Sequence, residues 1–114
     1  MALATNTDLL PVAALACADA YSAHGSSVII KDHPFVTVFS DADTAEIILD
    51  DVDSIEGAIG YVGQIAEVWN VVVVIPAELI GVAHRVLRGR FHNVELQPWW
   101  TEANRIWFGR VEVP

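Results

Sequence analysis

Carboxylate side chains gather in the middle of this sequence, where they could hold a divalent cation. Glu46 precedes Asp50 and Asp51, and Asp53 and Glu56 follow closely. Mg²⁺ and Mn²⁺ prefer oxygen ligands, so Asp50, Asp51 and Glu46 are candidate metal ligands. Acids are also favoured at the start of a helix, where they meet the positive end of the helix dipole. The pattern favours a capped helix over a metal site.

Tryptophan and arginine gather near the carboxyl end of the chain. Aromatic rings interleaved with arginine can stack on nucleic-acid bases, and they are also typical of protein–protein interfaces. They can equally cover the open end of a sheet. We expect core packing first, a protein interface second and nucleic acid last. The candidate interaction residues are Arg88, Arg90, Trp99, Trp100, Arg105, Trp107 and Arg110.

Three glycines, Gly57, Gly60 and Gly63, recur at a spacing of three. Each costs a helix about 1 kcal/mol relative to alanine, so three in one predicted helix indicate a purpose. A ridge without side chains allows another backbone to approach closely. We favour packing against the protein's own elements, and packing against a second copy across a two-fold axis stays open.

No catalytic constellation is recognisable elsewhere. The single cysteine, Cys17, excludes an intramolecular disulfide and a cysteine-based zinc cluster. The four histidines are scattered, and no serine or cysteine occupies a nucleophile elbow. We therefore predict no catalytic residues and no cofactor, with Mg²⁺ or Mn²⁺ required only if the carboxylates form a metal site.

Composition predicts one α/β domain over residues 1–114, with 54% hydrophobic residues. No apolar run reaches the roughly 18 residues of a membrane helix, and no basic residue precedes the apolar stretch 9–20. We therefore expect a cytoplasmic protein without membrane contact. Residues 1–83 carry twelve acids and one base, a net charge of −11, whereas residues 84–114 carry five arginines and three glutamates, a net charge of +2. The acidic body disfavours binding to phosphate backbones.

Hydrophobic periodicity predicts helices over residues 8–23, from Asp53 to Trp69, and from Pro76 to about Arg90. Asp8 is the expected cap of the first helix, and Asp53 with Glu56 the expected capping box of the second. Strands are predicted over residues 28–30, 36–39, 45–49, 71–75, 94–96 and 105–113. The order is α-β-β-β-α-β-α-β-β. It predicts an α/β (α+β) fold with a mixed central sheet and helices on both faces.

This order is similar to that of the restriction-endonuclease-like fold, the PD-(D/E)xK nuclease superfamily, and closest to archaeal Holliday-junction resolvases. The resemblance covers roughly residues 8–97. It also rests on Gln64 in the second helix and on the run Val71–Leu79, in which a buried strand meets a Pro-acid helix start. It implies a nuclease-like scaffold.

The motif of that superfamily places a metal-binding Asp after a Pro at the second strand and Glu-x-Lys at the end of the third. Here Phe35 follows Pro34, in the position of the Asp. If Asp50 replaces the glutamate of Glu-x-Lys, Val52 stands in the position of the lysine. Metal-dependent hydrolysis needs carboxylates and a group that positions water, and two of these positions are apolar.

A second alignment uses Asp41 or Asp43 together with Glu46, and it places Ile48 in the position of the lysine. Neither alignment restores the nuclease motif. The resemblance therefore implies a scaffold that has lost its active site.

Three functions follow from these observations. The leading hypothesis is a non-catalytic binding or assembly module that binds a protein partner or a second copy of itself as a homodimer. The second is a metal-dependent nuclease or nucleic-acid-processing protein that uses Asp50, Asp51 and Glu46. The third is an acidic inhibitor or immunity-type protein that presents carboxylates to a basic partner.

Overall fold

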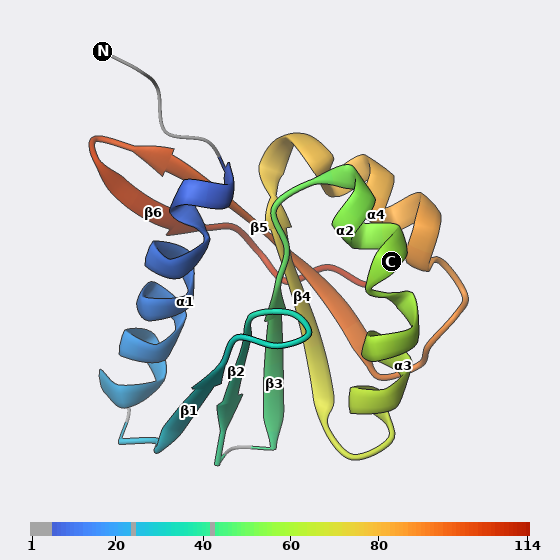
Figure 1. The fold of residues 1–114 in the computed structure, drawn as a ribbon, viewed down its shortest axis with the longest axis horizontal. Helices are drawn as coiled ribbons and strands as arrows, with labels where there is room; N and C mark the ends of the chain where they lie inside the picture. Colours follow the sequence, from blue (N-terminus) through green and yellow to red (C-terminus); the bar gives the residue numbers. More distant parts are fainter. Residues whose placement is uncertain (1–5, 24, 42) are drawn as a thin grey trace.

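A six-stranded sheet forms the middle of the molecule, with helices on both of its faces (Figure 1). The computed structural model describes residues 6–23, 25–41 and 43–114, with side chains from Pro11 onward. The helices are α1 (Asn6–Ala23), α2 (Val52–Gly57), α3 (Ile59–Ala66) and α4 (Ile80–Leu87), and a 3₁₀ turn, η1 (Ala77–Leu79), precedes α4. The strands are β1 (Val28–Lys31), β2 (Thr37–Ser40), β3 (Thr44–Ile48), β4 (Asn70–Pro76), β5 (Val94–Glu102) and β6 (Arg105–Phe108).

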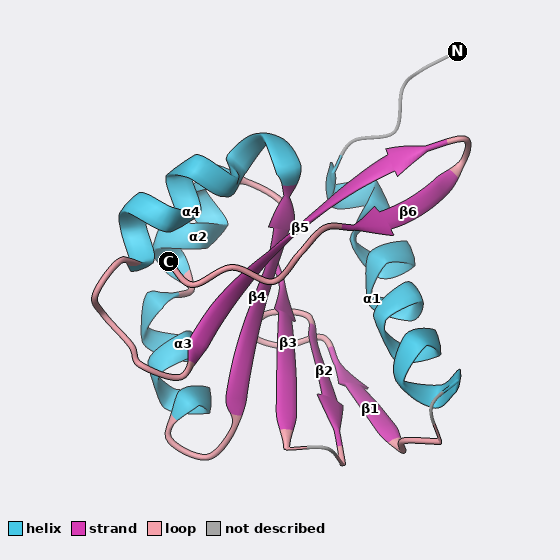
Figure 2. Ribbon diagram, turned by 180° about the vertical axis from the view of Figure 1, so that it is seen from behind, coloured by secondary structure: helices cyan, strands magenta, loops and turns pink. Residues whose placement is uncertain are grey.

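The strands lie in the sheet in the order of the chain, β1-β2-β3-β4-β5-β6. β1, β2 and β3 form an antiparallel meander, β3, β4 and β5 run parallel, and β6 returns antiparallel to β5. α1 covers one face, while α2, α3 and α4 cover the other, as the view from behind also shows (Figure 2). The predicted α+β class with a mixed sheet and helices on both faces is confirmed.

β4 lies in the middle of the parallel part of the sheet and is buried on both faces. Val71, Val73 and Ile75 pack toward α2, α3 and α4, whereas Val74 packs toward α1. A strand covered on both sides has no need for polar residues on alternate positions. The continuous apolar run predicted this burial, and the prediction is confirmed.

α1 packs on its face of the sheet through small side chains. Ala13, Ala14, Cys17 and Ala18 are buried against the sheet. Because these side chains are short, the helix lies close to the strands. The spacing of Leu10, Ala14, Cys17 and Tyr21 predicts one apolar stripe on this helix. Ala14 and Cys17 are buried as this predicts, Tyr21 is partly buried, and the side chain of Leu10 lies outside those that the structure describes. The helix begins at Asn6, so the expected cap, Asp8, lies inside it.

The helix expected over residues 53–69 is divided into α2 and α3 at Ala58. The capping box is formed by Asp51 and Ser54, not by Asp53 and Glu56 as predicted. The Ser54 N–H donates to Asp51 Oδ1 at 2.7 Å, and the Asp51 N–H donates to Ser54 Oγ at 3.2 Å. Asp51 is therefore the N-cap and Val52 the first helical residue. Ser54 accepts the hydrogen bond from the N-cap N–H, which is the role expected of a glutamate three residues after the cap.

β5 and β6 form a hairpin that was not predicted, and the lengths of both strands differ from those expected. β5 has nine residues and continues through Pro98 to Glu102, where a strand of three residues was predicted. Ala103 and Asn104 both have positive φ (53° and 62°), as a two-residue type I′ turn requires. β6 ends at Phe108, and the chain returns to β5 through an isolated bridge between Leu96 and Glu112.

Among the described helices, none combines the length and the apolar character that crossing a bilayer requires.

Candidate functional site

The outer face of the β5–β6 hairpin carries two tryptophans side by side. We call residues 98–109 the arm. Trp100 and Trp107 are directly paired across the two strands. Trp107 is 43% exposed, and Trp100 is partly exposed. The tip of the arm lies on the α1 side of the molecule, away from α2, α3 and α4 (Figure 1).

Neighbouring residues hold this tryptophan pair in place. The Trp107 Nε1–H donates to the Glu102 carbonyl at 3.0 Å, and the Arg105 guanidinium lies 5.7 Å from the centre of the Trp107 ring. Gly109 leaves room for the pair, because a Cβ there would lie 3.2 Å from the Trp100 ring and 2.7 Å from Pro98 Cγ. The arm thus presents a fixed aromatic surface with one arginine beside it, a composition typical of interface centres.

Trp99 is not part of this surface. It is 1% exposed and packs on the face of the sheet that α1 covers. Successive residues of a strand point to opposite faces, so Trp99 and Trp100 cannot share one surface. The prediction that Trp99 contributes to the interaction surface is wrong. Its Nε1 is buried, and no described group accepts a hydrogen bond from it.

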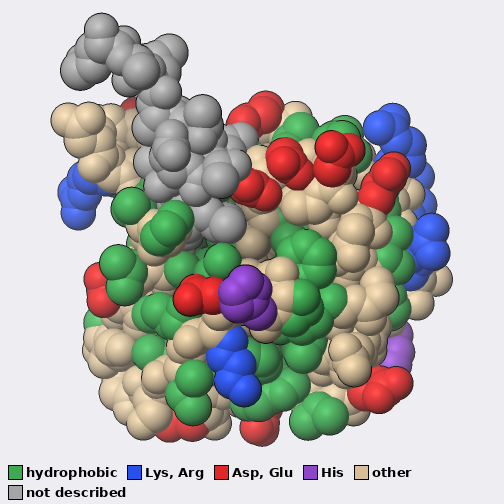
Figure 3. Space-filling model, viewed as in Figure 1, with side chains coloured by type: hydrophobic (Ala, Val, Ile, Leu, Met, Phe, Trp, Pro, Cys, Tyr) green, Lys and Arg blue, Asp and Glu red, His purple; other side chains and the backbone are tan. Residues whose placement is uncertain are grey.

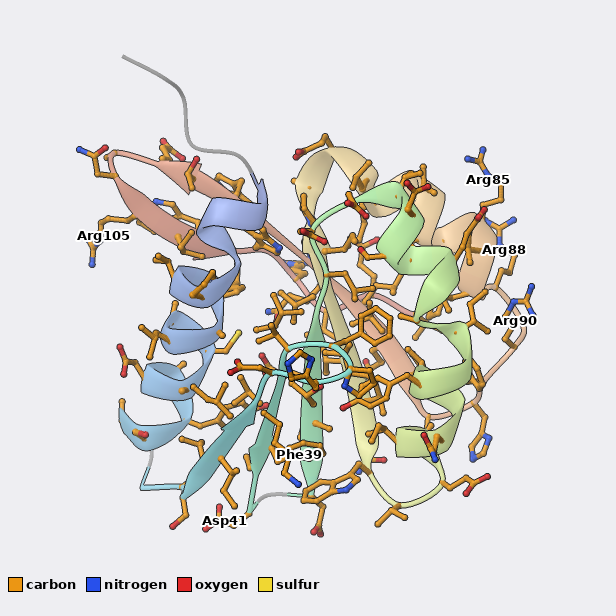
Figure 4. The ribbon with its side chains drawn as sticks, viewed as in Figure 1. Phe39, Asp41, Arg85, Arg88, Arg90 and Arg105 are labelled. Carbon is orange, nitrogen blue, oxygen red and sulfur yellow. The ribbon has the colours of Figure 1, made fainter. Side chains whose placement is uncertain are left out.

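The arginines of the predicted interaction surface lie in different parts of the molecule. Arg88 and Arg90 follow α4, on the opposite side of the molecule from Arg105 (Figure 4). Arg90 Nε donates to the Val86 carbonyl at 2.6 Å, which fixes it at the end of that helix. Arg110 is exposed after β6. The structure brings Arg105 to the tryptophans and leaves Arg88 and Arg90 apart.

The acids expected to bind a metal are also separated. Glu46 lies in β3 and is buried on the α1 face, whereas Asp51 caps α2 on the opposite face. Over the described ranges, no group of three or more histidine, cysteine or acidic side chains could hold a metal ion. Exposed acids gather over α2 instead, as the space-filling view shows (Figure 3).

Of the three apolar residues at positions of the nuclease motif, two pack in the protein and one is exposed. Phe35 packs against Tyr61, with 5.5 Å between ring centres, and the Tyr61 hydroxyl lies 2.8 Å from Thr37 Oγ1. Val52 is exposed at the first position of α2. Ile48 shares the α1 face with Glu46 and is buried in the core.

The two aspartates of the alternative alignment lie in the turn between β2 and β3. Asp41 accepts a hydrogen bond from the Ser27 N–H at 3.1 Å and lies at the end of β2, away from the helices (Figure 4). Asp43 is exposed and has a positive φ of 63°. These are roles in turns, as expected for residues of this type.

The glycine ridge does not form as predicted. Gly57 ends α2, whereas Gly60 and Gly63 belong to α3. A Cβ at Gly57 or Gly60 would have no neighbour within 4 Å among the described residues. At Gly63 a Cβ would lie 3.1 Å from the Phe91 ring. The space at Gly57 and Gly60 argues against internal close packing there, whereas the close neighbour at Gly63 is a side chain and not the backbone that the ridge would admit.

A pocket of about 290 Å³ lies between α1 and the sheet, and it was not predicted. Glu46 in β3, which is only 8% exposed, supplies its carboxylate. Cys17 and Tyr21 stand one helical turn apart on α1 and face the same carboxylate. The complete lining is Cys17, Ala20, Tyr21, Glu46, Gln97 and Phe108.

The buried carboxylate changes the acidity of its two neighbours. Burial raises the pKa of the Cys17 thiol far above its ordinary range, and the charge of Glu46 and the hydrogen bond to it act in the same direction. Burial also raises the pKa of Tyr21, together with the hydrogen bond to Glu46 and its charge. A hydrogen bond with Thr44 opposes this effect. Both groups are therefore neutral donors to Glu46 near neutral pH.

One signal in the sequence could have indicated this pocket. Glu46 is an isolated acid inside the apolar stretch Ala45–Leu49. In a buried strand such an acid must find hydrogen-bond donors. The Cys17 thiol and the Tyr21 hydroxyl, four residues apart on the first helix, are donors of this kind.

Comparisons of the chain with protein families, with curated proteins and with solved structures find no match.

Proposed function

We propose that this protein is a non-catalytic assembly module in which two copies associate through the outer face of the arm. The observation that carries this proposal is the cross-strand pair of Trp100 and Trp107. Trp107 keeps 43% of its surface exposed, although a buried indole contributes more to association than most side chains. β6 is also the last strand of the sheet, so its outer backbone groups are free to pair with another strand.

The charge distribution favours a second copy as the occupant of this face. Between Pro98 and Gly109 the only charged residues are Glu102 and Arg105, which cancel. The whole chain carries −9, so two copies repel each other at most other surfaces. The acids gathered over α2 lie away from the arm (Figures 1 and 3). A two-fold axis at the arm therefore brings two apolar, neutral faces together while the acidic bodies stay apart.

A scaffold similar to the restriction-endonuclease-like fold is consistent with this role, and the observed element order supports that part of the proposal. The metal-dependent nuclease is the weaker candidate. Its expected ligands Asp51 and Glu46 lie on opposite faces of the sheet. Phe35 packs against Tyr61, and Val52 is exposed and apolar, so neither supplies a polar group for a metal site.

Analytical ultracentrifugation over a concentration series tests the proposal. We expect the native protein to form a dimer. The dissociation constant of the dimer should rise by roughly tenfold or more in Trp107→Ser, because loss of one central aromatic side chain typically costs about 2 kcal/mol or more of binding free energy. Each 1.4 kcal/mol corresponds to roughly a tenfold change in the dissociation constant. Ile29→Ser is the matched control: Ile29 is 62% exposed on β1, the opposite edge of the sheet. Far-UV circular dichroism confirms that both variants fold.

Two outcomes would contradict self-association through the arm. One is a native protein that stays monomeric up to about 1 mM, the concentration that corresponds to only about 4 kcal/mol of binding. The other is a dimer that Ile29→Ser weakens and Trp107→Ser leaves intact. Retention by single-stranded DNA that depends on Trp107 would instead favour nucleic acid as the occupant.

A further inference from the structure

The pocket beneath α1 has a chemical character of its own, separate from the arm's outer face. The Glu46 side chain is only 8% exposed, and no described lysine, arginine or histidine forms an ion pair with its carboxylate. Burying a charge is costly unless other groups compensate it. Here the compensation within the described chain is limited to the neutral donors Cys17 and Tyr21.

The hydrogen-bond donors that line the pocket are largely occupied. The Tyr21 hydroxyl and the Cys17 thiol are directed to Glu46. One N–H of the Gln97 side chain donates to the Gly109 carbonyl at 3.0 Å, which fixes the amide. A carboxylate offers about four acceptor positions, so Glu46 keeps acceptor capacity after these two bonds. The pocket is therefore richer in free acceptors than in free donors.

The surroundings of the pocket are negative as well. The strand register places Glu46 opposite Val72 and Val72 opposite Glu95, so Glu95 lies on the same face two strands away. Asp19 is exposed on α1. Arg110 follows two positions after the lining residue Phe108; it is exposed and has no ion-pair partner among the described residues. None of the lining residues is basic, so an anion would meet the Glu46 carboxylate without a positive charge in the lining itself.

The apolar part of the lining sets the shape of a ligand. Ala20 and Phe108 line the pocket together with the rings and aliphatic parts of its polar residues. A volume of about 290 Å³ is at the lower limit of small-molecule pockets, which span roughly 300–1,000 Å³. Aromatic faces also attract cations, and Tyr21 and Phe108 supply two.

We infer that this pocket binds a small primary ammonium compound, with its –NH₃⁺ group on the Glu46 carboxylate and its short apolar chain against Ala20 and Phe108. An ammonium group carries three donors and no acceptor, which matches the free acceptors of the lining. It also supplies the positive charge that Glu46 lacks. A neutral alcohol supplies neither the charge nor the same number of donors, and a carboxylate is repelled.

An NMR titration with ¹⁵N-labelled protein tests this inference, with n-butylammonium as the probe and n-butanol and butyrate as comparators. We expect saturable shifts for the Gln97 side-chain amide and for the backbone of Cys17, Tyr21 and Glu46 with the ammonium probe alone. Equal shifts with n-butanol would overturn the inference, because they would show that the pocket recognises only the apolar chain. Shifts with Mg²⁺ and none with n-butylammonium would overturn it in favour of a metal.

Two variants identify the site. Glu46→Gln keeps the shape and removes the charge, and it should weaken n-butylammonium binding by roughly tenfold or more, because charge-assisted hydrogen bonds are about twice as strong as neutral ones. Ala20→Phe fills the pocket from an exposed helix position and should abolish binding even if Glu46→Gln does not fold. Ala23→Phe, on the same helix outside the lining, is its control and should bind as the native protein does. Binding that survives Ala20→Phe would overturn the assignment.

Discussion

Raising the pH should weaken this fold through Cys17, and replacing the cysteine should remove that part of the loss. In the folded protein, burial and the neighbouring Glu46 raise the pKa of the Cys17 thiol far above its ordinary range, so the thiol stays protonated. In the unfolded chain the thiol ionises at a pKa of about 8.5. Above that pH the folded state binds a proton that the unfolded state has released, and the free energy of unfolding falls as pH rises.

The size of the effect follows from linkage. The contribution of the protonated Cys17 thiol to the free energy of unfolding is complete below a pH of about 8.5. Above that pH it is lost at about 1.4 kcal/mol for each pH unit. Between pH of about 7.5 and 10, the thiol alone should cost about 2 kcal/mol. A domain of this size has a total stability of roughly 5–15 kcal/mol, so the loss is readily measured.

Urea unfolding under reducing conditions, followed by far-UV circular dichroism at both pH values, measures this difference. The native protein should lose about 2 kcal/mol more than Cys17→Ala between the two conditions. Cys17→Ser is the matched control: it keeps a donor for Glu46 but does not ionise, so its pH dependence should resemble that of Cys17→Ala. Equal losses in all three proteins would refute the reasoning, because they would show that the folded thiol titrates as the unfolded one does.

Two further predictions concern the backbone. Gly60→Ala should raise the free energy of unfolding by about 0.5–1 kcal/mol, because a Cβ there would have no described neighbour within 4 Å. Gly63→Ala should raise it less or lower it, because its Cβ would lie 3.1 Å from the Phe91 ring. Urea unfolding compares the two variants, and an equal gain in both would contradict the role of Phe91. Ala103→Gly should stabilise the turn of the arm by about 1 kcal/mol, because φ of 53° is strained for alanine. Thermal unfolding measures this gain. Ala16→Gly, inside α1, serves as a helical control that should lose stability. A loss in Ala103→Gly would show that the turn tolerates alanine without strain.

The fold could be predicted because its signals are local. The buried run of β4 and the short turn between β2 and β3 are each determined by adjacent residues. The division of the second helix at Ala58 could not be predicted, since no proline stands there and the apolar stripe continues from Ile55 through Val62. The capping box was misplaced by two residues, because Asp51 and Asp53 are equally good caps and only the geometry of the preceding loop selects between them.

The candidate sites were harder, because each depends on contacts between distant parts of the chain. Glu46 meets Cys17 and Tyr21 across 25 or more positions of sequence, and nothing local to β3 indicates which helix residues face it. The carboxylates after β3 were expected to act together with Glu46 because they are close in sequence. The alternation of the strand sends Glu46 to the α1 face, while the chain then turns to begin α2 on the other face.

The same alternation decides what each tryptophan of the arm can do. Trp99 and Trp100 are adjacent in β5, so a helix that covers one of them leaves the other uncovered. α1 covers Trp99, and the antiparallel register with β6 then places Trp107, and not Phe108, beside the uncovered Trp100. Phe108 turns instead to the pocket on the α1 face. Two adjacent residues in each strand thus serve opposite faces, which is why the association of two copies and the binding of an ammonium compound can be tested by separate substitutions in one hairpin.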